Sequence, residues 1–309
     1  MRVLVTGGAG FIGSNLAKRL AADGHDVTVV DDFSSAHWTN LIDFPGEVLT
    51  ANVANPEELI GLTSATPFEV IFHQASITDT TVHDQHKMLT NNLEGFRLVL
   101  EFAQQWKSRV VWASSASTYG RQTPPNNEGQ KPDPLNVYAY SKLAMERLAA
   151  RTQPKLAHPA VGLRYFNVYG PGEDHKGKFA SMIHQLAKQM RAGKRPRIFT
   201  PGSQKRDFVY VGDVVEANLL AMRATKPGSY NVGCGRAFTF NQVVAELNRV
   251  LGQDLTPDYF ENPYSFTQDW TQADLAASKA ALGYEPAFDL RKGIDAYFAS
   301  GKLGTAVGV

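Results

Sequence analysis

Short hydrophobic runs alternate with longer segments of helical periodicity through the first half of the chain. The runs are rich in β-branched residues and nearly continuous, which is typical of strands that helices cover on both faces. The alternation predicts βαβ units in an α/β fold with a doubly wound parallel sheet. Strands are expected at Val3–Thr6, Val27–Asp31, Val48–Asn52, Val70–His73, Val110–Ser114 and Val161–Tyr165, and helices at Asn15–Asp23, Pro56–Thr63, Leu89–Gln105 and Ala139–Thr152.

The alternation breaks down after Tyr165. A loop rich in glycine, lysine and acidic residues, Gly170–Lys178, precedes an amphipathic segment at Phe179–Ala192. We therefore predict a sheet domain over residues 1–165, to which segments near 203–235 return, and a smaller, interleaved C-terminal domain formed mainly by residues 166–309. Later elements are expected at Asp213–Ala224, Ser229–Val232 and Asn241–Leu251.

Composition and charge narrow the class of protein. The single cysteine, Cys234, excludes an intrachain disulfide framework, and the scattered histidines lack carboxylate neighbours at metal-ligand spacing, so no metal site is expected. The net charge of +1 gives no electrostatic reason to expect nucleic acid or an anionic membrane as partner. No apolar run approaches the roughly 18 residues that span a bilayer. The first ten residues are typical of a strand rather than a signal peptide, and the expected location is the cytoplasm.

A glycine-rich loop, Thr6-Gly7-Gly8-Ala9-Gly10-Phe11-Ile12-Gly13, follows the first strand and opens the first helix. Its glycines fit G-x-G-x-x-G as well as the wider G-x-x-G-x-x-G. Such a pattern allows a tight turn, a close approach of the backbone to a pyrophosphate, and close packing of helix on strand. The helix N-terminus then offers unpaired N–H groups to phosphate oxygens. The expected cofactor contacts are Gly7, Gly10, Phe11, Ile12 and Gly13.

An acidic residue, Asp31, ends the second predicted strand 18 residues after Gly13. An acid at this position hydrogen-bonds the adenosine ribose of a dinucleotide and repels a 2′-phosphate. Asp32 follows, and residues 31–38 contain no arginine or lysine that would bind that phosphate. The sequence therefore predicts a Rossmann domain that binds NAD in preference to NADP.

A candidate catalytic set lies downstream of the fifth predicted strand. Ser115 follows that strand, and Tyr138 and Lys142 stand four residues apart, on one face of a helix. A tyrosine titrates near 10, so its use as a base needs a lowered pKa, which a neighbouring lysine and a cationic nicotinamide ring would favour. Ser115 would stabilise the same substrate oxygen. Tyr140, whose i+4 partner is Ala144, lacks the lysine and is expected to pack.

These patterns together resemble the extended short-chain dehydrogenase/reductase superfamily, in its nucleotide-sugar branch. The likeness extends over essentially the whole chain, including R-Y-F-N-V-Y-G-P at 164–171 and R-D-F-V-Y-V-G-D-V at 206–214. It implies that Asn167 and Arg206 contact the diphosphate of a nucleotide-sugar substrate, for which a guanidinium is well suited. The alternative for Arg206 is a structural ion pair with Asp207 or Asp213. The likeness also implies that Tyr138 and Lys142 contact the cofactor.

The same resemblance bears on assembly. By analogy with the superfamily, it implies a homo-oligomer whose subunits pair through the helices near Leu89–Gln105 and Ala139–Thr152.

The resemblance favours epimerisation over other reactions. Dehydratases of the branch carry an Asp-Glu pair just before the Tyr119-Gly120 step, whereas here Ala116 and Ser117 stand there and cannot act as general acid and base. In an epimerase, NAD oxidises a carbinol of the sugar and the hydride returns to the opposite face. A net nucleotide-sugar oxidoreductase and a non-catalytic dinucleotide sensor are the alternatives.

A closer likeness is to the ADP-glyceromanno-heptose 6-epimerase family. It rests on Thr80-Thr81, Asn91-Asn92, Pro134-Leu135-Asn136-Val137-Tyr138, His175-Lys176-Gly177 and Thr271-Gln272-Ala273-Asp274. The family implies that Lys176 is a second acid/base, opposite the tyrosine; the alternative is that Lys176 only neutralises phosphate. The chain departs from the family at Gly172, where an arginine is usual, which keeps a UDP-hexose 4-epimerase open as an alternative.

Overall fold

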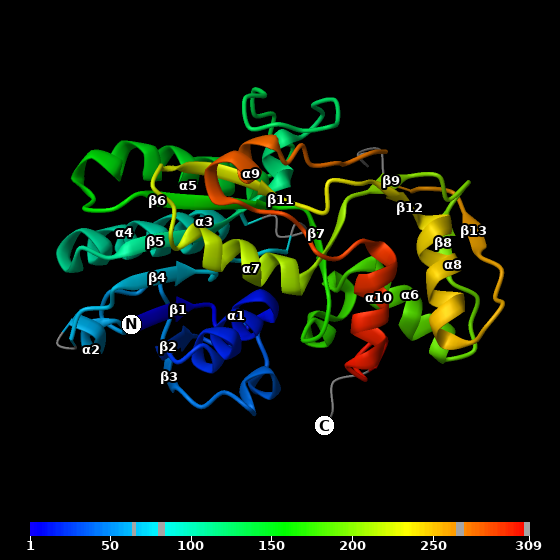
Figure 1. The fold of residues 1–309 in the computed structure, drawn as a ribbon, viewed down its shortest axis with the longest axis horizontal. Helices are drawn as coiled ribbons and strands as arrows, with labels where there is room; N and C mark the ends of the chain where they lie inside the picture. The colour runs from blue at the N-terminus through cyan, green and yellow to red at the C-terminus, as the bar shows by residue number, and fades with distance from the viewer. Residues whose placement is uncertain (64–65, 80–83, 264–268, 306–309) are drawn as a thin grey trace.

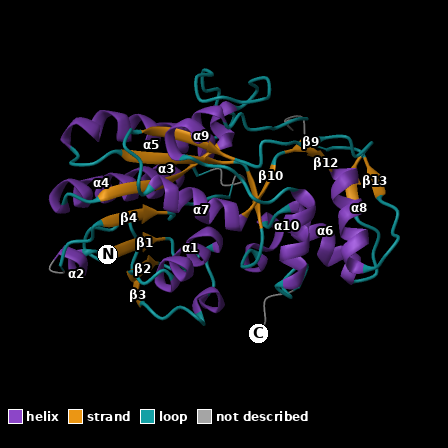
Figure 2. Cartoon of the chain, in the orientation of Figure 1, coloured by secondary structure: helices purple, strands orange, loops and turns teal. Residues whose placement is uncertain are grey.

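The computed structural model describes residues 1–309 except 64–65, 80–83, 264–268 and 306–309. A parallel seven-stranded sheet forms the larger part, in the strand order β11-β6-β5-β4-β1-β2-β3, and helices lie on both of its faces (Figure 1, Figure 2). The predicted doubly wound α/β fold is therefore confirmed. Its strands are β1 (Arg2–Thr6), β2 (Asp26–Asp31), β3 (Glu47–Thr50), β4 (Val70–His73), β5 (Arg109–Ser115), β6 (Ala160–Tyr165) and β11 (Gly228–Val232).

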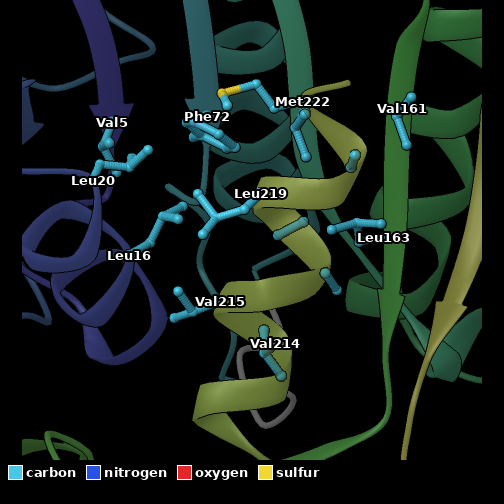
Figure 3. Close-up of a cluster of buried hydrophobic side chains, with 14 of the residues drawn as sticks. Val5, Leu16, Leu20, Phe72, Val161, Leu163, Val214, Val215, Leu219 and Met222 are labelled. Atoms are coloured by element: carbon cyan, nitrogen blue, oxygen red, sulfur yellow. The ribbon is translucent and has the colours of Figure 1, made fainter. Parts of the chain in front are cut away.

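Two hydrophobic cores hold the helices on the sheet. The strands alternate apolar side chains between the faces, so each face buries its own set. On one face, α1 (Phe11–Ala22), α7 (Val211–Ala221) and α9 (Ala276–Leu282) pack on the sheet, and the side chains of α1 and α7 meet those of the strands (Figure 3). The opposite face is covered by α2 (Ile60–Thr63), α4 (Gly95–Trp106) and α5 (Val137–Thr152).

The strand order identifies the end of the sheet at which a ligand is expected to bind. From β1 the chain runs outward to β2 and β3 and then returns to β4 on the other side of β1. Ligands of open α/β sheets bind at the carboxyl ends of the strands where the order reverses in this way. The glycine-rich loop follows β1, and Ser115 ends β5, so both lie at the carboxyl ends of the parallel strands.

A smaller group of elements with a core of its own, called the smaller domain below, lies beyond the carboxyl ends of the strands (Figure 1). Its core joins Ile183 and Leu186 of one helix to Val243, Leu247 and Ile294 of two others. Of the segments near 203–235, α7 and β11 lie with the large sheet, whereas the two short strands before α7 lie with this smaller domain. Its elements are β7 (Asn167–Tyr169), α6 (Met182–Arg191), β8 (Arg197–Phe199), β9 (Lys205–Arg206), β10 (Phe208–Tyr210), β12 (Phe238–Thr239), α8 (Phe240–Leu251), β13 (Asp258–Phe260) and α10 (Leu290–Ala299).

Two predicted helices differ from the structure. The helix expected over Pro56–Thr63 is reduced to the single turn of α2, and that expected over Leu89–Gln105 consists of α3 (Gln85–Leu89), a π-helical turn (Thr90–Glu94) and α4. The π-turn has a physical cause in Asn92, which is buried. Its side chain bonds the N–H and C=O of Ile77 at 2.8 and 3.1 Å and the hydroxyl of Ser141 at 3.0 Å. The wider π-turn places the Asn92 side chain where its amide reaches Ser141 of α5.

The sequence analysis did not predict α9 and α10 in the C-terminal region. Prolines and glycines in this region interrupt the hydrophobic periodicity by which a short helix is recognised. None of the helices within the described part of the chain has the length and apolar character needed to cross a membrane.

Replacing Asn92 with alanine should destabilise the protein by about 2 kcal/mol, because the backbone groups of Ile77 and the Ser141 hydroxyl would lose a buried partner. Urea unfolding measures this loss. Asn127→Ala is the control, since Asn127 is exposed and accepts only the Gly129 N–H on the surface. Equal stability changes in the two variants would contradict the assigned role of Asn92.

Candidate active site

Bare backbone shapes the loop between β1 and α1. Gly7 has a φ of +68°, and a Cβ there would lie 2.4 Å from the Ala75 nitrogen, just past β4. A Cβ on Gly13 would lie 2.1 Å from the Gly7 carbonyl oxygen. A side chain fits at neither position, so these glycines are required by the close approach of the loop to the sheet and to itself.

The start of α1 is open to a ligand. Gly10 is the N-cap residue and supplies no side-chain hydrogen bond, so the N–H groups of Phe11, Ile12 and Gly13 begin the helix without a capping side chain. Such a terminus carries a partial positive charge and favours phosphate oxygens. The glycine cradle and the uncapped helix together fit the pyrophosphate of a dinucleotide.

Asp31 holds the loop from the end of β2. Its Oδ2 accepts the N–H of Ala9 at 2.9 Å and its Oδ1 accepts the N–H of Phe33 at 2.9 Å. Burial raises the pKa of this carboxyl group, although the two backbone N–H groups favour its charged form. Asp32 is exposed and bonds Ser34. Asp31 therefore shapes the loop itself, and its contact with a ribose, like that of Asp32, stays a prediction.

The structure brings together Ser115, Tyr138 and Lys142. Ser115 ends β5, and its side chain lies beside that of Tyr138, in the first turn of α5. Asn136 caps this helix by accepting the Ala139 N–H at 2.8 Å, which fixes where Tyr138 stands. Lys142 is buried; its Nζ donates to the Ala113 carbonyl oxygen at 2.8 Å and lies 5.7 Å from the centroid of the Tyr138 ring.

Burial dominates the protonation of these groups. It raises the pKa of Tyr138, while the hydrogen bond from Ser115 lowers it less, and it lowers the pKa of Lys142 to about 7. The sequence led us to expect that Lys142 lowers the pKa of Tyr138. In the protein alone the removal of water outweighs that effect, so the pKa of Tyr138 lies above its usual value and that of Lys142 below its usual value.

A cavity of about 410 Å³ lies in the smaller domain. Both predicted diphosphate contacts, Asn167 and Arg206, line it, as do Lys176 and Arg197. No carboxylate is among its lining residues, so the cavity is cationic in character. Five phenylalanines supply its apolar walls: Phe179, Phe199, Phe208, Phe240 and Phe260.

Arg206 forms neither of the ion pairs considered as its alternative role. The Asp207 carboxylate is fully buried and accepts three backbone N–H groups, while that of Asp213 accepts two others, from Ala287 and Phe288. The Arg206 guanidinium instead lies 5.9 Å from the Phe240 ring centroid and donates to the Lys205 carbonyl oxygen at 2.9 Å. It remains available to a ligand in the cavity.

Lys176 lies between the cavity and α1. It belongs to a short 3₁₀ helix (Asp174–Phe179), is half-buried, lines the cavity, and places its Nζ 5.7 Å from the ring centroid of Phe11. Burial lowers the pKa of Lys176, and the nearby Glu173 opposes that shift.

The chain is similar to proteins of known activity over nearly its whole length. The model of the NAD dependent epimerase/dehydratase family matches residues 3–233. The protein belongs to this family. Its membership confirms the predicted resemblance, the class of enzyme and NAD as the cofactor.

Three solved structures illustrate the likeness. ADP-L-glycero-D-manno-heptose-6-epimerase of Helicobacter pylori is 42% identical, with 97% of this chain and 95% of that chain covered and a TM-score of 0.91. UDP-glucose 4-epimerase of Thermotoga maritima, solved with UDP-glucose, is 31% identical over 97% and 99%, with a TM-score of 0.90. UDP-glucuronic acid 4-epimerase of Bacillus cereus, solved with UDP-glucuronic acid and NAD, is 26% identical over 97% and 98%, with a TM-score of 0.84.

Sequence reasoning missed several residues of this family member's site. The five cavity phenylalanines come from three strands, one α-helix and the short 3₁₀ helix, and no local pattern connects them. Asp207 lies within the recognised R-D-F motif, but its three partners, at Cys234, Gly235 and Ala273, are distant in sequence. Nowhere in the described ranges do three or more His, Cys, Asp or Glu side chains gather as a metal ion would need.

His73 is a further buried group at the end of β4, as the sequence suggested. Its Nδ1 bonds the Thr6 hydroxyl at 2.8 Å, its ring stacks on Phe96, and its Nε2 has no hydrogen-bond partner among the residues placed by the structure. Burial, with a smaller contribution from the nearby Lys142, lowers the pKa of His73 to about 3. The ring is therefore neutral at physiological pH.

Acidic pH should lower the free energy of unfolding through the titration of His73. An unfolded histidine titrates near 6.5, so between pH 6.5 and 3 the unfolded state binds the extra proton. The free energy of unfolding then falls as the pH drops, by up to about 1.4 kcal/mol per pH unit from this residue. Urea unfolding at pH 7 and pH 4.5 should show a smaller loss in His73→Asn, which has no such proton to bind. Parallel losses in both proteins would contradict this assignment.

Proposed function

We propose that the protein epimerises a nucleotide-diphosphate sugar of the ADP-heptose class. The position of Lys176 carries the proposal, because this ammonium group borders both the cationic cavity and the helix that begins the cofactor site. The likeness to the Helicobacter pylori heptose epimerase supports the choice of sugar.

The cavity residues would bind the nucleotide half of the substrate. Arg206 and Asn167 would hold the diphosphate, since a guanidinium forks onto phosphate oxygens and an amide donates to them. The phenylalanine walls would pack against the base, whose faces are apolar. This anchoring leaves the sugar free to turn at the end where Ser115 and Tyr138 lie.

NAD, held by the glycine cradle and the start of α1, supplies the hydride acceptor and donor when it is bound. The Tyr138 phenolate takes the proton of the reacting sugar hydroxyl, while the Ser115 hydroxyl donates a hydrogen bond to the same oxygen. Lys142, fixed by the Ala113 carbonyl, places an ammonium group beside the phenolate. In the return step, one hydride and one proton restore the alcohol with inverted configuration.

Lys176 would act in the second orientation of the sugar. After the sugar turns, its carbonyl oxygen needs a proton donor on the side away from Tyr138, and Lys176 would supply it. Tyr138 would then release its proton to solvent and Lys176 would take one up, which restores both groups for the next turnover. Burial lowers the pKa of this lysine, which makes its proton easier to release near neutral pH.

A UDP-hexose 4-epimerase is the second candidate, favoured by the likeness to the Thermotoga maritima enzyme. Incubation with ADP-heptose, UDP-glucose and UDP-N-acetylglucosamine, followed by proton NMR of the products, distinguishes the two. Turnover of ADP-heptose alone, strongly lowered but still measurable in Lys176→Met, is the expected result. If the protein converts a UDP-hexose and the Lys176→Met variant still does so, the second candidate is favoured. Stoichiometric accumulation of NADH would indicate a net oxidoreductase.

We also propose that the enzyme forms a homo-oligomer in the cytoplasm, with pairing through α4 and α5. Leu135 and Tyr140 are exposed by 39% and 45% next to the start of α5, which supports an interface there. Sedimentation analysis tests this assembly, and a monomer at micromolar concentration would exclude it.

Tyr138→Phe should lower turnover by at least about a hundredfold, because the proton acceptor is removed while the ring is kept. Folding and NAD binding should be retained, as measured by thermal unfolding with and without NAD. Tyr140→Phe is the matched control, since Tyr140 lies two residues away and is exposed. Near-normal turnover in Tyr138→Phe would remove this tyrosine from the mechanism.

A further inference from the structure

The turn after β7 lies against the beginning of α1, although the two are far apart in sequence. The Asn15 side-chain amide donates to the Pro171 carbonyl oxygen at 2.9 Å and to the Phe11 carbonyl oxygen at 2.8 Å. It thereby joins the second turn of α1 to the segment that leads to Lys176.

A second amide, that of Asn40, makes a parallel connection and is almost fully buried. Its Nδ2 donates to the carbonyl oxygens of Ala9 and Gly172 at 3.0 and 3.3 Å and lies 3.2 Å from Nδ1 of His175. Burial lowers the pKa of His175, so its ring is neutral and Nδ1 can accept. The amide nitrogen of Asn40 thus lies within hydrogen-bond distance of three acceptors. One acceptor belongs to the glycine-rich loop, and the other two belong to the segment that carries Lys176.

The turn fits this place because it carries no side chain at Gly172. Its φ is +96°, and a Cβ there would lie 3.3 Å from Asn15 Nδ2 and 3.6 Å from Asn40 Oδ1. The two asparagines therefore enclose the backbone of the turn directly.

The other side of the turn is fixed to the smaller domain. Glu173 is fully buried and accepts the Gly170 N–H at 3.1 Å and the Ser181 hydroxyl at 2.8 Å. The Lys176 N–H donates to the Glu173 carbonyl oxygen at 3.0 Å. Lys176 thus belongs to a short segment that hydrogen bonds hold on two sides. Glu173 joins this segment to the smaller domain, and the asparagine pair, Asn15 and Asn40, joins it to α1 and the glycine-rich loop.

We propose that Asn15 and Asn40 are positioning residues that set Lys176 relative to the cofactor loop. The proposal rests on the proposed function, in which Lys176 acts on the substrate. A catalytic group displaced by about 1 Å loses roughly a hundredfold in rate, so contacts that tie it to the cofactor loop matter even when they touch no ligand. Through Ala9, Asn40 connects the placement of Lys176 to the loop that would hold the pyrophosphate, and Asn15 connects it to the first turn of α1 through Phe11.

Hydrogen exchange of the backbone amides in residues 170–180 tests the contact without catalysis. Asn15→Ala and Asn40→Ala should each accelerate this exchange by about tenfold, the effect of losing a hydrogen bond of typical strength. Asn248→Ala is the matched control: Asn248, in α8, makes two similar bonds to the backbone of Leu255 and is not among the described residues that line the cavity. Unchanged exchange in both variants, or equal acceleration in the control, would overturn the proposal.

A double-mutant cycle measured at saturating NAD tests the link to Lys176. Asn40→Ala should lower kcat by about tenfold in the wild type but by less than about twofold in Lys176→Met, because the positioned group is then absent. Equal factors in the two backgrounds would overturn the positioning role. If Lys176→Met itself leaves kcat unchanged, the proposed acid/base role fails, and the exchange measurement still decides whether the asparagine pair holds the segment.

Discussion

The close approach of bare backbone between β1 and α1 is the constraint on which the site depends. A Cβ at Gly7 would lie 2.4 Å from the Ala75 nitrogen, so the loop reaches the end of β4 only because it carries no side chain there. This approach brings the unpaired N–H groups of α1 to the sheet edge where β5 ends in Ser115. In the proposed function the phosphates and the reacting centre would therefore meet at this end of the sheet, and the carboxylate of Asp31 keeps the loop in place.

Burial determines how the proton-transfer groups respond to ligands. With the pKa of Lys142 lowered to about 7 and that of Tyr138 raised, neither side chain carries its full charge in the protein alone. Charges interact strongly once water is excluded, so a cationic ring beside Tyr138 stabilises the phenolate far more than it would in solvent. In the proposed mechanism the tyrosine would therefore become a base mainly when the cofactor and substrate complete the site, which would limit proton transfer to the loaded enzyme.

Local patterns predicted the strands, the glycine loop and the spacing of Tyr138 and Lys142, because each depends on neighbours within one turn or one strand. Features that depend on distant partners were not predictable. The π-turn at Asn92 arises from contacts with Ile77 and Ser141, and the role of Asn40 from contacts with Gly172. The pKa of Tyr138 was expected to fall, since spacing indicates a nearby lysine but says nothing of how much water the fold removes.

The chemistry of the cavity follows from what an epimerase must allow. A sugar that turns between two half-reactions breaks every hydrogen bond it makes in the first orientation, and each bond of about 1 kcal/mol adds to the barrier for turning. Affinity is therefore better supplied by the nucleotide, which stays in place. In the proposed function, Arg206 and the phenylalanine walls would serve a group that does not move, and among the described residues no carboxylate lines the cavity beside Arg206. Discrimination between sugars would then be left to the few groups at the reacting end, among them Lys176.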